Sequence, residues 1–167
     1  GGRDRFLRAA VAPQALLDLA SLPEVVWIER YRAPRLWNGV ARTIVGAPAV
    51  WSNHELRGEG QIIAVADTGL DNGDLSRISA DFRGRIVAAF GLGRAGRWDD
   101  PNGHGTHVAG TAAGSGQNSA SDPASGSYAQ SHAGIAPRAQ LVIQSVLDDH
   151  GGLGGLLILT ALMAGCR

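Results

Sequence analysis

The sequence predicts an α/β fold with a largely parallel sheet, because short apolar segments typical of strands alternate with segments typical of helices. Three strands are expected, at residues 61–66, 85–90 and 140–146, and a regular helix at 104–113 lies between the second and the third. A hydrophobic content of 44% and a charged content of 18% over 167 residues are typical of a globular protein with a sizeable core.

The N-terminal elements are shorter and less regular. Leucines and alanines at 14–20 predict a short amphipathic helix, which Pro23 ends. An apolar run at the centre of 24–31 predicts a strand, and residues 32–37 would form a linker. A second short helix is expected at 47–51.

The central strands are separated by segments of different character. The apolar strand at 61–66 ends in Asp67, which places an acidic side chain at its carboxyl end. Residues 114–134 are rich in serine, glycine, alanine and asparagine, and they predict a flexible surface loop before the strand at 140–146.

Composition excludes some classes of partner. A formal net charge of zero gives no support for nucleic-acid binding. The longest apolar run, 153–164, contains two glycines and is shorter than the roughly 18 residues that a membrane helix needs. The first residues carry no signal peptide, which fits either a removed N-terminus or a cytosolic protein. The single cysteine, Cys166, cannot form an internal disulfide and is interpreted as a bystander rather than a reactive thiol.

Two short motifs carry the candidate chemistry. Asp67 closes a strand and is followed by Thr-Gly, and His104 stands between two glycines at the start of a helix. In this order the motifs resemble those of the subtilisin-like serine proteases (subtilases, peptidase family S8), whose triad runs Asp, His, Ser along the chain. The resemblance implies that Asp67 orients His104, that His104 acts as general base, and that the two side chains lie within roughly 2.6–3.2 Å.

The resemblance covers roughly residues 38–156 and implies a domain organisation. Residues 38–45 resemble the mature N-terminus of the oxidation-resistant alkaline serine proteases of bacilli. Processing near Trp37–Asn38 is therefore one hypothesis, and an uncleaved loop is the other. Residues 1–37 would be the tail of a pro-domain or N-terminal domain plus a linker. Residues 38–167 would be the N-terminal part of the catalytic domain, a partial three-layer subtilisin-like fold truncated after the third strand.

A glycine-rich stretch follows the third strand. In subtilases this stretch pairs with the substrate backbone like an added strand. The resemblance therefore implies that Gly151, Gly152 and Leu153 line the substrate site, and the alternative is a flexible turn without a ligand role.

The family's Gly-Thr-Ser motif does not occur in these 167 residues, and the family's oxyanion asparagine would also lie beyond them. The resemblance implies a secreted serine endopeptidase acting on proteins or peptides, with this chain supplying Asp and His and being inactive alone. A non-catalytic pseudoprotease or binding remnant is the rival interpretation. Without the family's later strands, the strand at 61–66 would be an open edge, so marginal stability and self-association are expected.

Metal binding is the alternative use of the histidines. His104 and His107 share one helix, but no third ligand is evident, and no cofactor is required for the implied chemistry. His107 is instead expected to pack inside or to donate to a backbone carbonyl. The remaining histidines are expected to be solvated: His54, His132 and His150. A structural calcium ion stays unassigned, and the candidate oxygens are interpreted as a solvated turn: Asp71, Asn72 and Asp74.

Two motifs in the sequence also fit other enzyme classes. Residues 91–96 fit G-x-G-x-x-G, but Pro101 follows closely and no acid occupies the ribose-binding position about 20 residues later, so a dinucleotide site is disfavoured. Asp67-Thr-Gly is also the aspartic protease motif, which in a single copy would require a dimer.

Overall fold

The computed structural model describes residues 7–33, 37–119, 128 and 131–153. The chain divides into two compact units, Gly1–Leu36 and Trp37–Arg167. Cys166 and most of the apolar run at 153–164 lie outside the described residues. Within the described part of the chain, no helix is long and apolar enough to cross a membrane.

The described residues of the N-terminal unit, 7–33, contain one helical segment. A 3-10 turn, η1 (Pro13–Ala15), leads into α1 (Leu16–Ala20), which confirms the helix predicted at 14–20. The strand predicted at 24–31 is wrong: these residues are irregular, and Val26 and Trp27 are 93% and 78% exposed. An apolar run becomes a strand only where a neighbouring strand accepts its hydrogen bonds, and the described residues of this unit provide none.

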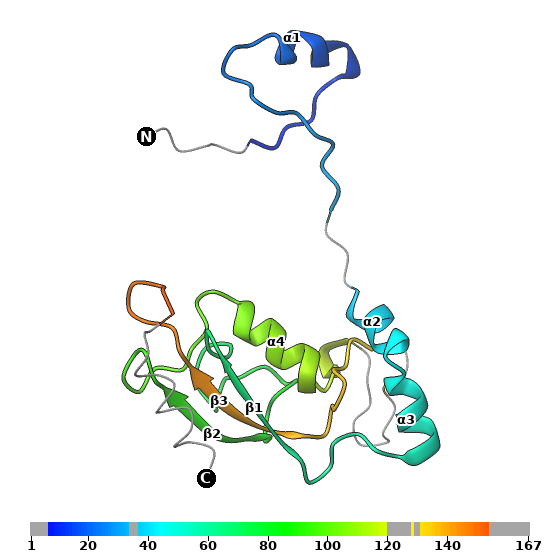
Figure 1. Cartoon of the computed structure of the whole chain (residues 1–167), viewed down its shortest axis with the longest axis vertical. Helices are drawn as coiled ribbons and strands as arrows, with labels where there is room; N and C mark the ends of the chain where they lie inside the picture. Colours follow the sequence, from blue (N-terminus) through cyan, green and yellow to red (C-terminus); the bar gives the residue numbers. More distant parts are fainter. Residues whose placement is uncertain (1–6, 34–36, 120–127, 129–130, 154–167) are drawn as a thin grey trace. The chain divides into compact units, whose positions relative to one another are not determined.

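The second unit is built on a parallel sheet. Strands β1 (Ile62–Asp67), β2 (Ile86–Gly91) and β3 (Gln140–Ser145) lie in the order β1-β3-β2 (Figure 1). Asp67 and Gly91 are both in register with Ser145, so the three strands end at the same edge of the sheet. This arrangement confirms the predicted fold class, and the strand bounds differ from the predicted ones by one residue.

Helix α4 (His104–Ala113) packs against β1 and β3 and has the predicted bounds (Figure 1). Its buried residues, Gly105, Ala109 and Ala113, are small, which lets the helix lie close to the sheet. The core between them is formed by buried apolar side chains from the strands, the helix and the connecting turns: Val65, Leu70, Ile78, Phe82, Ala109, Ala113, Ala139, Leu141 and Ile143.

Two helices precede the sheet. Helix α2 (Asn38–Ile44) was not predicted, because Gly39 and the β-branched residues of 38–45 weaken the helix signal. Helix α3 (Ala47–His54) extends the short helix predicted at 47–51 by three residues. The buried Arg42 side chain of α2 donates hydrogen bonds to the carbonyl oxygens of Ala133, at 2.8 Å, and Ser131, at 3.1 Å.

The prediction of a surface loop at 114–134 is wrong for part of its described residues: Gln117, Asn118 and His132 are exposed, but most of the others are buried. Ser115, Tyr128, Ser131 and Ala133 are all buried. Arg42 holds Ser131 and Ala133 by hydrogen bonds. Tyr128 and Ala133 also belong to a second small core that joins α3 to this segment: Ala47, Trp51, Tyr128 and Ala133. A polar and glycine-rich composition therefore does not prevent the burial of these residues.

Candidate active site

The predicted acid and base meet at the carboxyl edge of the sheet. Asp67 is the last residue of β1 and His104 is the first residue of α4. The Oδ1 atom of Asp67 lies 2.8 Å from Nδ1 of His104, within the distance expected from the sequence. The Asp67 side chain is 18% exposed and the His104 side chain is 66% exposed. The carboxylate is therefore sheltered, while a second reactant has room to approach the imidazole.

The contact changes the acidity of both groups. Burial raises the pKa of Asp67, but hydrogen bonds from His104 and from the Thr68 amide hold that pKa below its usual value. The hydrogen bond to Asp67 raises the pKa of His104, and the negative charges of Asp67 and Asp100 act in the same direction. Asp67 is thus ionised at neutral pH and stabilises a protonated imidazole, as a base that accepts a proton requires.

Asp100, a half-buried acid, bonds to the residues beside Asp67 and His104, and it was not among the predicted site residues. Its carboxylate accepts hydrogen bonds from Thr68 Oγ1 at 2.7 Å, and from the amide and hydroxyl of Thr106 at 2.8 and 2.6 Å. The signal that could have found it is an acid just before a helix start, because the first amides of a helix favour a nearby carboxylate. Asp100 lies four residues before His104 in the printed sequence.

Close backbone packing joins the two motifs. An added Cβ at Gly105 would overlap the carbonyl oxygen of Gly69 and lie 2.9 Å from its nitrogen. Gly69 has φ +130°, and a Cβ there would lie 2.7 Å from the carbonyl oxygen of Trp98. Glycine is required at both positions, for space at Gly105 and for space and conformation at Gly69.

The predicted substrate-binding residues lie beyond β3, at the same edge of the sheet. The Val146 amide donates to the Asp67 carbonyl at 2.8 Å, which fixes where this loop begins. Gly151, Gly152 and Leu153 are exposed. The Gly152 carbonyl accepts a hydrogen bond from the Asp148 amide, and the Gly152 amide donates to the Asp148 carboxylate, each at 2.8 Å. Substrate pairing at Gly152 would require this loop to open, and its role stays a prediction.

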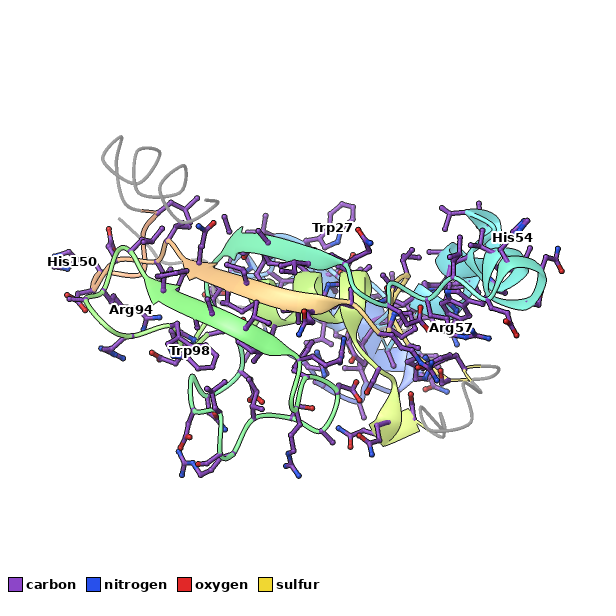
Figure 2. The ribbon with its side chains drawn as sticks, turned by 90° about the horizontal axis from the view of Figure 1, so that it is seen from below. Trp27, His54, Arg57, Arg94, Trp98 and His150 are labelled. Carbon is purple, nitrogen blue, oxygen red and sulfur yellow. The ribbon has the colours of Figure 1, made fainter. Side chains whose placement is uncertain are left out.

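The other histidines are not part of this site. His107 is exposed, so the prediction that it packs inside is wrong: α4 turns its small residues toward the sheet, and His107 lies off that face. The remaining three are exposed, as expected: His54, His132 and His150. Figure 2 shows His150 and Arg94 near the carboxyl ends of the strands, and His54 and Arg57 near the opposite end.

The geometry gives little support to the metal, calcium and dinucleotide interpretations. Within the described ranges, no group of three His, Cys, Asp or Glu residues could hold a metal ion. In the turn weighed as a calcium site, Asp71 accepts a hydrogen bond from the Ser79 amide, and Asp74 accepts from Ser76. The segment 91–96 forms a turn without a following helix, so it lacks the helix N-terminus of a dinucleotide site. In that turn Arg94 is buried and pairs with Asp99 at 3.2 Å.

Comparison with known proteins identifies relatives of the chain. The model of the "Subtilase family" matches residues 58–164. An "Intracellular serine protease" of Paenibacillus polymyxa is 37% identical over 108 residues, which cover 65% of this chain and 29% of the relative. The "Major intracellular serine protease" of Bacillus subtilis (strain 168) is 32% identical over 144 residues, which cover 86% of this chain and 36% of the relative. The chain therefore spans about a third of the length of these relatives.

A solved structure shows the same fold. The Clostridium perfringens CspB protease superposes with a TM-score of 0.51 and 24% sequence identity, over 72% of this chain and 27% of that chain. The expectation of secretion, by contrast, is contradicted: both curated relatives are named intracellular serine proteases. The resemblance to a secreted branch of the family gave the wrong location.

The matched segment contains Asp67 at the end of a central parallel strand and His104 at the start of the helix beside it. The acid contacts a histidine rather than a second carboxylate, which disfavours the aspartic protease interpretation. The family match covers most of the chain, and the fold agrees with that of the CspB protease. The chain belongs to the subtilase family.

Proposed function

We propose that this chain supplies the acid and the general base of a serine endopeptidase, with Asp67 and His104 as two members of an Asp-His-Ser triad. The 2.8 Å contact between the sheltered Asp67 carboxylate and the exposed His104 ring is the observation that carries the proposal. The subtilase match and the serine protease relatives support the same reaction.

In the proposed mechanism, Asp67 accepts a hydrogen bond from Nδ1–H of His104 and leaves Nε2 free to act as a base. Nε2 takes the proton of the serine hydroxyl while the serine oxygen attacks the peptide carbonyl carbon. The imidazolium then gives this proton to the leaving amine, and an acyl-enzyme remains. Water hydrolyses the acyl-enzyme by the same proton transfers.

The serine is proposed to lie outside these 167 residues, because no Gly-Thr-Ser occurs in them. Residues 38–167 would then be the N-terminal part of the catalytic domain, and 1–37 the tail of a preceding domain plus a linker. Gly151, Gly152 and Leu153 would pair with a protein or peptide substrate. The reaction requires no metal ion or cofactor, and a structural calcium ion is left unassigned.

The test compares the 167-residue chain with the intact protein, the product of the full reading frame, which on this proposal contains a downstream Gly-Thr-Ser. We expect the intact protein to hydrolyse a generic peptide substrate and to be silenced by a fluorophosphonate, and the 167-residue chain to show no turnover above background. An intact protein without turnover would support the pseudoprotease interpretation. Fluorophosphonate-sensitive turnover by the short chain would show that one of its own serines is the nucleophile.

A further inference from the structure

We propose that Asp100 is a positioning residue of this site: its carboxylate ties the turn after β1 to the first turn of α4 and so keeps His104 in contact with Asp67. The catalytic consequence rests on the proposed function. The positioning itself rests on the contacts of Asp100 and is tested separately from activity.

The first set of contacts reaches the strand side. The Thr68 hydroxyl donates to Oδ1 of Asp100 at 2.7 Å, and Thr68 directly follows Asp67. The same hydroxyl accepts a hydrogen bond from the Gly105 amide at 2.9 Å. Thr68 therefore links the Asp100 carboxylate, the end of β1 and the start of α4 through a single buried oxygen.

The second set of contacts holds α4 on both sides of His104. The Gly103 amide donates to Oδ1 of Asp100 at 2.9 Å, and the Thr106 amide and hydroxyl donate to Oδ2 at 2.8 and 2.6 Å. The N-cap residue Gly103 has no side chain that could cap the helix, so Asp100 satisfies these donors instead. A carboxylate at this end of a helix is also favoured by the helix dipole.

The third set of contacts closes the network through the backbone. The Asp100 amide donates to the Asp71 carbonyl at 2.9 Å, and the Asp71 amide donates to the Thr106 hydroxyl at 2.8 Å. Asp71 has φ +47°, a conformation that non-glycine residues adopt at some cost and that surrounding contacts must hold. The turn after β1, the segment before α4 and the helix start are thus tied together by one carboxylate and two threonine hydroxyls.

The charge of Asp100 is maintained although it is partly buried. Burial raises the pKa of Asp100, but hydrogen bonds from Thr106 and Thr68 hold that pKa below its usual value. Its negative charge adds to that of Asp67 in raising the pKa of His104. Removal of the carboxylate would therefore act on His104 in two ways, through a looser contact with Asp67 and through the lost charge.

The test is an NMR titration of the His104 ring in the 167-residue chain. We expect Asp100→Asn to shift the His104 pKa down toward that of an ordinary histidine, because Asn keeps the size of the side chain but cannot accept from all the same donors. Asp74→Asn is the matched control: it removes the same charge from an exposed turn whose carboxylate bonds to Ser76 and Arg77, and His104 should titrate as in the unaltered chain.

A second pair of variants separates positioning from loss of charge. Thr106→Val removes the hydroxyl that joins Asp100 to Asp71, and Thr106→Ser keeps it. We expect Thr106→Val to lower the His104 pKa, as Asp100→Asn does. Thr106→Ser should leave the His104 pKa as it is in the unaltered chain. In the intact protein, Asp100→Asn should lower kcat on the order of tenfold to a hundredfold with little change in KM, since the ring rather than the substrate is misplaced.

Three results would overturn or redirect the proposal. If Asp67→Asn shifts the His104 pKa but Asp100→Asn and Thr106→Val do not, Asp100 is a helix cap only, and the acid–base pair stands. If Asp67→Asn also leaves the His104 pKa unchanged, the pair itself is refuted. If both Asp100→Asn and Thr106→Val lose the folded state in a denaturant melt, the carboxylate holds the whole domain and is not a positioning residue.

Discussion

The second residue of α4 has no space for a side chain, and this gives the sharpest stability prediction. In Gly105→Ala, the new Cβ would overlap the Gly69 carbonyl oxygen and lie 2.9 Å from the Gly69 nitrogen and 3.1 Å from the Thr68 nitrogen. These are backbone atoms, so no side-chain rotation relieves the overlap, and α4 must move away from the turn after β1. Overpacking of this kind typically costs about 1–3 kcal/mol. The better helix propensity of alanine offsets at most about 1 kcal/mol.

We therefore expect Gly105→Ala to lower the free energy of unfolding by about 2 kcal/mol. Gly110→Ala is the matched control, because it makes the same change in the same helix. The atom nearest to a Cβ at Gly110 is Cζ of Phe82, at 3.9 Å, an ordinary contact. This variant should be neutral or more stable by about 0.5–1 kcal/mol.

Urea unfolding followed by circular dichroism measures both values, and equal slopes confirm that the same transition is compared. The movement of α4 in Gly105→Ala should also separate His104 from Asp67. The pKa of His104 should therefore fall toward its ordinary value in this variant, and it should not fall in Gly110→Ala. A Gly105→Ala chain as stable as the Gly110→Ala chain would refute the close packing of the two motifs.

Three other predictions concern charge, burial and the sheet edge. The Asp67–His104 pair should stabilise the fold fully between the ordinary pKa values of the two side chains, about 4 and 6.5. That stabilisation is lost as pH rises through the raised His104 pKa and as pH falls through the lowered Asp67 pKa, so Asp67→Asn should flatten the pH dependence of urea unfolding. Arg42→Met leaves two carbonyl oxygens without their donor and should cost about 2 kcal/mol in the same assay, whereas an unchanged midpoint would count against these bonds. Strand β1 pairs only with β3 among the described strands, so the 167-residue chain should self-associate on size-exclusion chromatography, and a monodisperse monomer would contradict this.

The sheet and α4 could be predicted because their signals are local. Each strand is an apolar run bounded by turn residues, and the helix begins at a glycine-flanked histidine. The strand expected at 24–31 fails for the opposite reason, since strand formation depends on a partner elsewhere in the chain. The buried segment around Ala133 could not be predicted either, because its burial depends on Arg42, 91 residues away.

The site, like the fold, has one feature with a local sequence signal and others that depend on distant residues. The contact between Asp67 and His104 could be expected from two motifs whose order along the chain is specific. For Asp100 the position of an acid just before a helix start is the one local signal. Its full set of contacts could not be expected, because its threonine partners lie 32 residues before it and 6 residues after it. The exposed position of His107 depends on which face of α4 meets the sheet, and the small residues at Gly105, Ala109 and Ala113 decide that.

The central claim is that His104 is the base of a serine peptidase and that His107, three residues further along α4, is not. The most direct measurement is kcat for a peptide substrate in the intact protein, with His104→Ala compared with His107→Ala. Both changes remove an exposed histidine from α4, but only His104 contacts Asp67. We predict that His104→Ala lowers kcat on the order of 10²–10⁴-fold or more while His107→Ala leaves it within a factor of about two. Equal losses in the two variants, or turnover that survives His104→Ala, would contradict the account.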